Sequence, residues 1–299
     1  MIQDQLVFRT YTTLSRGLAA LPEPLANGVA NVVGDVLFRV RHDHRRMVTG
    51  NLRRVLDADQ DDVAALDRWA RRSFRAYARY WVEGARLGST SPAEVEQRTF
   101  VQGLQYLVEG IAAGAGVIMA LPHVGSWEYG GAFLATKGLP MTSVAERIEP
   151  PELFEFFVEQ RAGMGLTIVP LDTSSGSAIL STLRRGGLVG LLSDRDLNGT
   201  GIGVEFFGER TTMPAGPATL ALRAGATLVT GAVYSGPGSD HRAIVDPPID
   251  TTRRGSLRSD VSRITQEIAH RFERCIRRAP EQWHVFQPLW SADRPGGSA

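Results

Sequence analysis

The chain has 299 residues, of which 43% are hydrophobic and 22% charged, and its formal net charge is +1. These values are those of an ordinary folded protein, and they exclude a polyelectrolyte or a disordered chain. The single cysteine excludes an intrachain disulfide and a cysteine-built metal site, and it agrees with a reducing, cytoplasmic compartment. Because no run of about 18 uninterrupted apolar residues occurs, we expect no transmembrane helix.

The N-terminal segment combines positive charge with apolar helical spacing. Residues 1–56 carry eight arginines against four acidic residues, a local net charge of +4. Pro22 and Pro24 divide the segment into two expected helices. Apolar faces interleaved with arginine are typical of helices that lie on an anionic membrane surface. A helical layer packed on the rest of the protein, with solvated arginines, explains the same pattern, so the sequence leaves both interpretations open.

The remainder of the chain predicts an α/β fold. A long helix is expected over 63–85, and from about residue 100 short apolar runs alternate with helical patterns. Strands are expected at 116–121, 141–145, 167–171, 188–193, 203–207, 227–234 and 242–245. Helices are expected at 126–137, 151–164, 176–185, 214–224 and 256–278. We therefore predict one α/β domain over 1–299, with a helical, membrane-contacting layer over 1–95 and, over 96–299, a core built on a mixed, largely parallel sheet flanked by helices.

A histidine and an acidic residue follow the first of these strands. Pro122 ends the strand, so His123 lies just beyond a carboxyl end, where open α/β sheets form their ligand crevices. Ser126 is expected to cap the next helix, which places Glu128 in the first turn. A carboxylate beside an imidazole fixes the tautomer and stabilises the protonated ring, as a general base requires. His123 and Glu128 are therefore candidate catalytic residues; the alternative for an isolated histidine is a hydrogen-bonded loop residue.

The loop between the histidine and the helix offers a second feature. Gly125 has no side chain and would let a substrate approach the backbone closely. Free N–H groups at the start of the helix could face an oxyanion. We therefore expect this loop to contact the reacting part of a substrate.

The local motif resembles that of a known enzyme family. His123-Val-Gly-Ser-Trp-Glu128 is similar to the His-x4-Asp/Glu motif of glycerolipid acyltransferases, in the form found in bacterial lipid A lauroyl/myristoyl acyltransferases. Further blocks, in the same order along almost the whole chain, resemble the actinobacterial phosphatidylinositol mannoside acyltransferases. These blocks are Ala78-Arg-Tyr-Trp-Val-Glu83, Val144-Ala-Glu-Arg-Ile148, Asp194-Arg-Asp-Leu197, Val204-Glu-Phe-Phe-Gly-Glu209, Met213-Pro-Ala-Gly-Pro217 and Trp283-His-Val-Phe-Gln-Pro288. The short motif is moderately specific by itself, and the ordered blocks make the resemblance strong.

The resemblance implies a peripheral membrane acyltransferase on the cytoplasmic face of the cell membrane. It would move a long-chain acyl group, with palmitoyl as the expected one, from acyl-CoA to the 6-OH of a mannose of phosphatidylinositol mannoside. His123 would act as general base on the hydroxyl, so that no acyl-enzyme forms. The alternatives are the same chemistry on another glycolipid or a lysophospholipid, and a non-catalytic lipid-binding protein of the same fold.

The resemblance also assigns residues and partners. It pairs the histidine with a second acid, here Asp194, where the family carries the longer glutamate; whether Glu128 or Asp194 orients His123 stays open. The residues expected to bind substrate are Glu146, Arg147, Arg161, Arg195 and His284. The expected partners are long-chain acyl-CoA as co-substrate, a mannosylated phosphoinositide and an anionic membrane surface. No cofactor is expected, and no nucleic acid, because the basic patches lack interleaved aromatics.

Residues 194–205 also fit the calcium-loop pattern D-x-D-x-N-G-x5-E. The context argues against calcium binding, because an EF-hand loop lies between two helices whereas strands are expected at 188–193 and 203–207. In addition, Gly201 occupies the loop position that is usually apolar. We therefore expect no metal site.

Overall fold

The computed structural model describes residues 2–59, 62–197, 199–290 and 293. The helices of this part are α1 (Ile2–Ala20), α2 (Glu23–Val40), α3 (His42–Leu56), α4 (Val63–Leu87), α5 (Pro92–Gln97), α6 (Leu104–Ala112), α7 (Trp127–Thr136), α8 (Pro151–Gly163), α9 (Ser175–Arg184), α10 (Gly216–Ala224), α11 (Leu257–Arg278) and the short 3₁₀ helix η1 (Pro280–Gln282). Its strands are β1 (Thr99–Gln102), β2 (Val117–Leu121), β3 (Met141–Ala145), β4 (Thr167–Pro170), β5 (Leu188–Leu192), β6 (Ile202–Phe206), β7 (Glu209–Met213), β8 (Thr227–Ser235) and β9 (His241–Val245).

A mixed sheet forms the centre of the molecule. Among the described residues it has seven strands in the order β1-β9-β8-β2-β5-β3-β4. Strands β8, β2, β5, β3 and β4 are parallel to one another, whereas β9 is antiparallel to β8 and parallel to β1. Strands β6 and β7 form a separate antiparallel hairpin. The predicted α/β class and the mixed, largely parallel sheet are confirmed.

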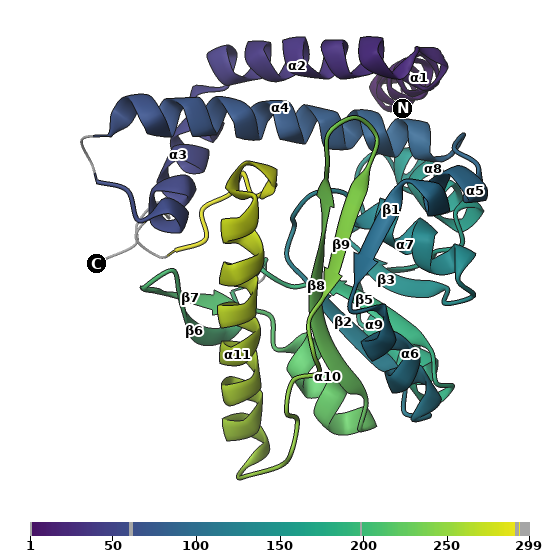
Figure 1. The fold of residues 1–299 in the computed structure, drawn as a ribbon, viewed down its shortest axis with the longest axis vertical. Helices are drawn as coiled ribbons and strands as arrows, with labels where there is room; N and C mark the ends of the chain where they lie inside the picture. Colours follow the sequence, from purple (N-terminus) through teal and green to yellow (C-terminus); the bar gives the residue numbers. More distant parts are fainter. Residues whose placement is uncertain (1, 60–61, 198, 291–292, 294–299) are drawn as a thin grey trace.

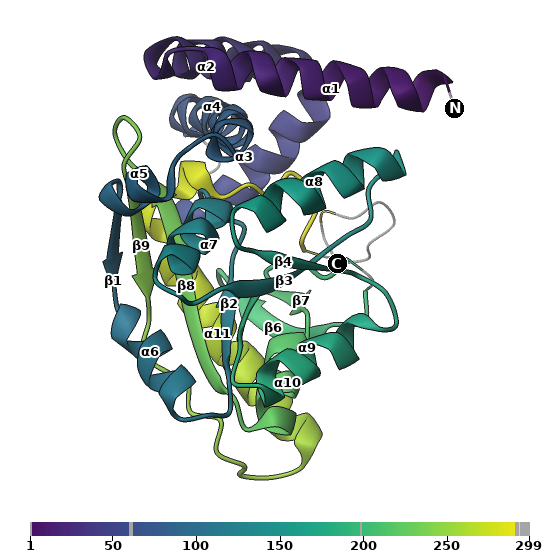
Figure 2. The same ribbon diagram turned by 90° about the vertical axis from the view of Figure 1, so that its right-hand side faces the viewer.

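Helices cover both faces of this sheet (Figures 1 and 2). On one face, buried residues of α9, α10 and α11 join the sheet and the β6–β7 hairpin in one apolar cluster. On the other face, residues of α6 and α7 form a second cluster with the opposite side chains of the strands. All five residues of β2 are buried, as expected of a central strand whose two faces are both covered.

The N-terminal helices form a layer above the sheet. In Figures 1 and 2, α4 crosses the top of the molecule and α2 lies over α4, on the side away from the sheet. The expectation of two helices before residue 57 is wrong, because the second divides at Arg41, whose backbone is not helical. The break lets Val48 and Leu52 of α3 pack against α4, where Leu66 and Phe74 are buried with them. This tertiary contact stabilises the break at Arg41, which the local sequence pattern does not predict.

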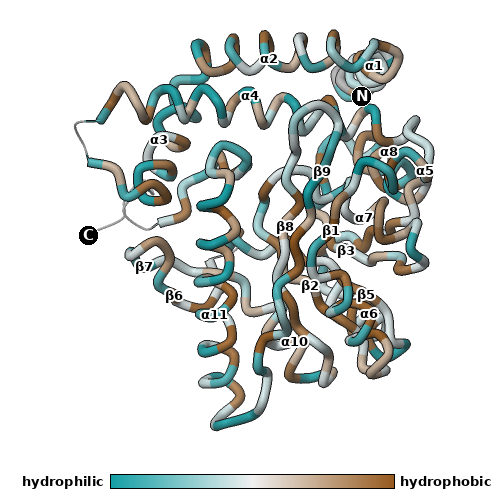
Figure 3. The backbone as a smooth tube through the Cα atoms, in the orientation of Figure 1, coloured by the Kyte–Doolittle hydropathy of each residue, from teal (hydrophilic) through white to brown (hydrophobic). Residues whose placement is uncertain are grey.

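Helix α2 packs small residues against α4 along most of its length, and near its end Leu37 and Phe38 pack inward on the cluster of α3 and α4. Ala26, Ala30 and Gly34 are buried against α4. A Cβ atom at Gly34 would lie 2.6 Å from the Cα of Arg75, so only glycine permits this close helix contact. An adjoining, exposed face carries aliphatic side chains that are each at least 40% exposed: Leu25, Val29, Val32, Val33, Val36 and Val40. Figure 3 shows the hydrophobic segments that recur along α2.

Candidate active site

Two adjacent parallel strands bring a histidine and an aspartate together. In the register of β2 and β5, Leu121 is opposite Leu192. His123 and Asp194 each follow two residues later, so they leave the sheet side by side at the carboxyl edge, although 71 positions separate them in the chain. Ligand crevices of open α/β sheets form at this edge. The pairing therefore depends on the strand order of the sheet.

Asp194 holds His123 by both the backbone and the ring. Its Oδ1 contacts the Nδ1 of His123, and its Oδ2 accepts a hydrogen bond from the His123 backbone N–H at 2.9 Å. The Asp194 side chain is fully buried, whereas the His123 side chain is 17% exposed. Because Nδ1 donates to the carboxylate, Nε2 carries a free lone pair, and no described residue hydrogen-bonds to it. A histidine in this geometry can accept a proton at Nε2 from a group bound beside it.

The buried carboxyl of Asp194 remains acidic. Burial by itself raises the pKa of Asp194, but the His123 charge, with hydrogen bonds from His123 and Trp283, lowers the pKa below its usual value. An ionised Asp194 stabilises the imidazolium that forms when His123 takes up a proton.

Glu128, the other candidate partner, does not contact His123 in the structure. Its Oε1 accepts hydrogen bonds from Tyr80 Oη at 3.0 Å and from Arg161 Nη2 at 2.9 Å. The first turn of α7 directs this buried side chain toward α4 and α8, where the guanidinium of Arg161 offsets the burial of its charge. Of the two acids that the sequence left open as partners of His123, Asp194 is therefore the one that contacts it, and Glu128 contacts Tyr80 and Arg161 instead.

The expected substrate contact at Gly125 is also corrected. The N–H of Gly125 donates to the Gln282 carbonyl at 2.9 Å, and the N–H of Ser126 donates to the Val233 carbonyl at 2.9 Å. Gly125 has a φ of +61°, and a Cβ here would overlap the Val233 carbonyl oxygen, so glycine serves a close approach to β8. Ser126 occupies the N-cap position of α7, as expected, but its side chain makes no capping hydrogen bond.

The C-terminal segment packs directly on the histidine loop. The His284 N–H donates to the His123 carbonyl at 2.7 Å, and Val124 forms an antiparallel bridge with Trp283. The His284 ring lies against Tyr77 and Tyr80, and its buried Nδ1 has no hydrogen-bond partner among the residues that the structure describes. Burial, together with the charge of His123, lowers the pKa of His284 to about 3, so this imidazole stays neutral.

The other expected substrate-binding residues lie in different surroundings. Glu146 follows β3 directly, on the same edge of the sheet as His123, and is exposed. Arg147 is exposed and forms a long ion pair of 3.5 Å with Asp172. Arg161 is bound to Glu128 and lies 5.3 Å from the ring centroids of Trp127 and Phe157. Arg195, beside Asp194, is half-buried, and its Nε makes no hydrogen bond within the described part of the chain.

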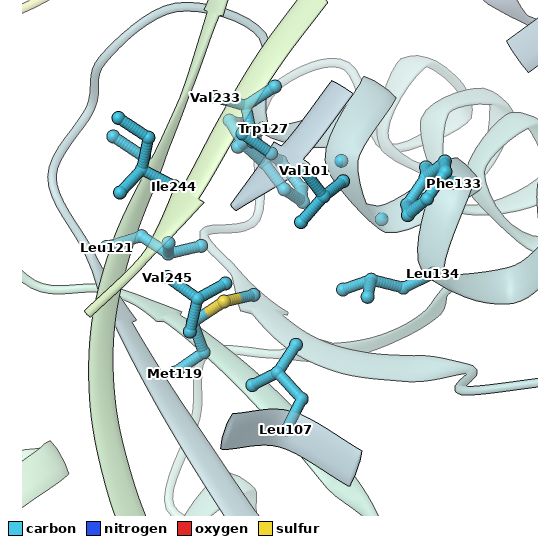
Figure 4. A pocket seen from close by; sticks show the side chains of 14 residues that line it. Val101, Leu107, Met119, Leu121, Trp127, Phe133, Leu134, Val233, Ile244 and Val245 are labelled. Atoms are coloured by element: carbon cyan, nitrogen blue, oxygen red, sulfur yellow. The ribbon is translucent and has the colours of Figure 1, made fainter. Parts of the chain in front are cut away.

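An apolar pocket lies beneath the histidine loop (Figure 4). Leu107 of α6 and Phe133 of α7 line it from one side, and Met119 of β2 and Val245 of β9 line it from the sheet. Trp127, four residues after His123, also borders it, and no charged residue does. The free volume of the pocket is about 20 Å³, room for little more than one water-sized group, so the side chains that line it must move apart before it can admit a longer hydrocarbon chain.

The loop with the calcium-like pattern performs a different task. Strands β5 and β6 border it, as expected, and Asp194 is turned toward His123. Asp196 accepts a hydrogen bond from the Gly201 N–H at 2.9 Å, which closes the loop on itself. Among the described residues, no group of three histidine, cysteine or acidic side chains is placed to hold a metal ion.

Two residues that contact the site were not assigned a role from the sequence. Trp283 donates from its indole Nε1 to Asp194 Oδ2 at 2.8 Å, and Tyr80 binds Glu128. Both lie in blocks that carry the family resemblance, which was the one available signal. Their contacts, however, join segments far apart in the chain, so no local pattern reveals them.

Comparison with known proteins gives consistent matches along the chain. The model of a family described as bacterial lipid A biosynthesis acyltransferase matches residues 5–292. A phosphatidylinositol mannoside acyltransferase of Mycolicibacterium smegmatis is 36% identical over 282 residues, which are 93% of this chain and 89% of the relative. Phosphatidylinositol mannoside acyltransferases from two strains of Mycobacterium tuberculosis are 36% identical over 262 residues, which are 86% of this chain and 80% of each relative.

Proposed function

The chain belongs to the bacterial lipid A biosynthesis acyltransferase family, and from this premise we propose that it acylates a phosphatidylinositol mannoside. The acyl group, with palmitoyl as the expected one, comes from acyl-CoA and is placed on the 6-OH of a mannose. The names of the curated relatives support this acceptor. The contact of His123 Nδ1 with Asp194, which leaves Nε2 open, is the observation that carries the proposal.

His123 is the general base of the proposed reaction. Its Nε2 accepts the proton of the mannose hydroxyl while the hydroxyl oxygen attacks the thioester carbonyl carbon. A C–O bond forms, and the C–S bond then breaks as the tetrahedral intermediate collapses. The imidazolium returns its proton to the departing CoA thiolate. Asp194 stabilises the imidazolium throughout, and no acyl-enzyme is required.

The start of α7 supplies donors for the oxyanion. The amides of Gly125 and Ser126 are engaged, but those of Trp127 and Glu128 donate no hydrogen bond within the described residues. Such amides at a helix N-terminus stabilise negative charge. They follow the base within five residues, so a carbonyl held beside His123 lies near the N-terminus of α7.

The apolar pocket and the other candidate site residues are assigned to the acyl donor or to the sugar acceptor. The apolar pocket of Figure 4 is the proposed site for the part of the acyl chain next to the thioester, since its lining is apolar and Trp127 borders it, and its side chains move apart when the chain enters. Glu146 and Arg161 contact the sugar, and His284 borders the reacting centre. Arg147 and Arg195 bind anionic groups; Arg195 suits a phosphate because it is half-buried and its Nε has no hydrogen-bond partner among the described residues.

The outer face of α2 is the proposed membrane contact. Within the described residues, no helix has the length and hydropathy to span a bilayer. The exposed leucine and valines of α2 nevertheless form a continuous apolar stripe on the helix farthest from the sheet. The same helical layer carries exposed arginines, among them Arg9 and Arg16 on α1 and Arg41 just after α2. This combination suits the surface of an anionic membrane, on its cytoplasmic face.

Product analysis tests the reaction. Purified protein is incubated with palmitoyl-CoA and, separately, phosphatidylinositol mannoside, an unrelated glycolipid and a lysophospholipid, and the products are identified by mass spectrometry. We expect acylation of the mannoside.

His123→Ala should lower the rate of acyl transfer at least about 100-fold, the contribution of a general base. Binding of acyl-CoA, measured by calorimetry, should be kept. His270→Ala, an exposed histidine of α11, is the control. Undiminished transfer by His123→Ala overturns the mechanism, and acylation of a different acceptor alone overturns the substrate assignment.

Vesicle sedimentation tests the membrane contact. The double variant Val32→Glu/Val36→Glu places two charges on the apolar stripe and should lose most binding to vesicles that contain anionic lipid, because charged groups resist entry into the apolar phase. Val108→Glu, at a valine that is 50% exposed on α6, is the matched control and should bind like the unchanged protein. Equal sedimentation of both variants would show that α2 does not contact the membrane.

A further inference from the structure

The indole of Trp283 is hydrogen-bonded to the acid of the catalytic pair. Its Nε1 donates to Asp194 Oδ2 at 2.8 Å, and both side chains are buried. The same oxygen accepts the His123 backbone N–H, while Oδ1 faces the imidazole. Oδ1 of the carboxylate therefore contacts the His123 ring, and Oδ2 accepts hydrogen bonds from the Trp283 indole and the His123 backbone.

Such an arrangement needs external donors, because the torsion of the aspartate side chain does not provide it. The χ2 angle of aspartate is broad and nearly two-fold, so a carboxylate rotates easily unless hydrogen bonds fix it. One of the two donors to Oδ2 is the backbone N–H of His123, the residue whose ring the carboxylate orients. This donor therefore cannot fix the carboxylate independently of His123. Trp283 comes from a different segment and fixes the plane of the carboxylate relative to the rest of the fold.

Trp283 is itself held firmly. Its ring lies 6.0 Å from the ring centroids of Phe206 and Phe207, which belong to the β6–β7 hairpin, and 6.4 Å from that of Trp290. Its backbone forms the bridge with Val124. Two residues later, the Val285 carbonyl accepts a hydrogen bond from Asn51 of α3 at 3.0 Å. The indole N–H thus has a defined position before any substrate binds.

We propose that Trp283 is a positioning residue, which fixes the Asp194 carboxylate through its indole N–H and so sets the orientation and basicity of His123. The C-terminal segment then controls the reactivity of the base, although it carries neither member of the pair. This inference rests on the proposed role of His123 as general base. Failure of His123→Ala to lose activity would overturn that role, whereas failure of the Trp283 test alone would overturn only the positioning.

Trp283→Phe removes the donor and keeps an aromatic ring. We expect kcat to fall about 10- to 100-fold, as is typical when a residue that orients a reactive side chain, without contacting the substrate, is replaced. KM for both substrates should change by less than about twofold, because the substrate contacts remain. Trp290→Phe is the matched control: Trp290 lies in the same aromatic cluster and donates to the Phe206 carbonyl, not to Asp194. The control should lose stability to a similar degree and keep kcat.

The pH profile separates positioning from simple loss of packing. A carboxylate with one donor fewer holds the proton of the imidazolium more tightly, so the acidic limb of kcat/KM should move to higher pH in Trp283→Phe and not in Trp290→Phe. Other titratable groups near the pair are His284, with Tyr77 and Tyr80 against its ring and Glu83 acting on its charge, and Arg195, which follows Asp194 in the chain; neither variant changes them. The proposal would be overturned if Trp283→Phe and Trp290→Phe had the same kcat and the same position of the acidic limb of kcat/KM.

An isosteric replacement covers the case in which Trp283→Phe does not fold. Benzothienylalanine at position 283 has sulfur in place of the indole N–H and nearly the shape of tryptophan. We expect the same fall in kcat and the same shift of the acidic limb, together with a displaced resonance of the His123 Nδ1 proton in the NMR spectrum. Full activity with an unshifted resonance would show that the shape of Trp283, and not its hydrogen bond, is what the site needs.

Discussion

Two buried carboxylates lie close to the same loop, and their surroundings differ. At the junction of β2 and β5, Asp194 binds the backbone and ring of His123 and the indole of Trp283. At the junction of α7, α4 and α8, Glu128 binds Tyr80 and Arg161 through Oε1, and its buried Oε2 has no partner in the described part of the chain. The first site couples a carboxylate to a titratable ring, and the second couples one to a permanent cation.

This difference assigns different tasks to the two acids. A carboxylate on a histidine controls the tautomer and the proton affinity of the ring. A carboxylate on an arginine compensates a buried charge, and it fixes the start of α7 and the position of α8. Proximity along the chain favours Glu128 as the partner of His123, whereas proximity in space favours Asp194. The acid of the His-x4-acid motif thus binds a neighbouring arginine, and His123 contacts an acid from the distant loop that follows β5.

The largest expected effect comes from Asp194→Asn. Two N–H donors point at the position of Oδ2, so the asparagine carbonyl takes that place and its NH2 group faces His123 Nδ1. The ring is then held with its proton on Nε2 and cannot accept one from a substrate. We expect kcat to fall about 10³- to 10⁴-fold, as when a catalytic histidine has the wrong tautomer. Steady-state kinetics measures this.

Two further variants show whether the loss of kcat in Asp194→Asn is specific to the contact with His123. Asp260→Asn, at another buried and multiply hydrogen-bonded aspartate, at the start of α11, should lower stability and leave kcat near its original value. Asp194→Glu restores the charge with a longer side chain and should recover part of the loss. If Asp194→Asn keeps most of its activity, Asp194 is not the partner of the base and the comparison between the two acids fails.

A smaller effect on catalysis, and a larger one on stability, is expected for Glu128→Gln. The substitution keeps the shape but leaves the guanidinium of Arg161, whose side chain is only 16% exposed, without its counter-charge. Removing one member of a buried ion pair costs about 3 kcal/mol, which urea denaturation measures. We expect kcat of the folded fraction to fall no more than about tenfold. Glu152→Gln, on the exposed start of α8, is the control. A loss of kcat equal to that of Asp194→Asn would make Glu128 the true partner.

Much of the fold could be predicted from the sequence where periodicity was strong. The run Val-Ile-Met-Ala-Leu of β2 and the apolar spacing of α11 indicate their elements directly, because burial on both faces and on one helical face leaves distinct patterns. The short elements β1, β7, α5 and α6 were not predicted. Strand β7 is Glu-Arg-Thr-Thr-Met, and it is a strand because it pairs with β6. Its own composition gives no such indication.

The N-terminal segment illustrates a question that local sequence leaves open. Apolar residues interleaved with arginines suit either a membrane surface or a packed layer. In the fold, Ala26 and Ala30 meet α4 and the valines point outward, and Arg71 and Arg75 on α4 hydrogen-bond Asp35 and hold its pKa well below the usual value. Which face of α2 is covered depends on the shape of α4, which the residues of α2 do not encode.

The sequence by itself determined the family resemblance, the α/β class and the location of His123 after a buried strand, because these features lie in contiguous residues. Only the tertiary structure decided the partner of the base and the donor that holds this partner. His123, Asp194 and Trp283 come from three segments. Their meeting depends on the order of β2 and β5 in the sheet and on the return of the chain after α11. Strand order and chain return arise from the packing of the whole core, so no local pattern of residues contains them.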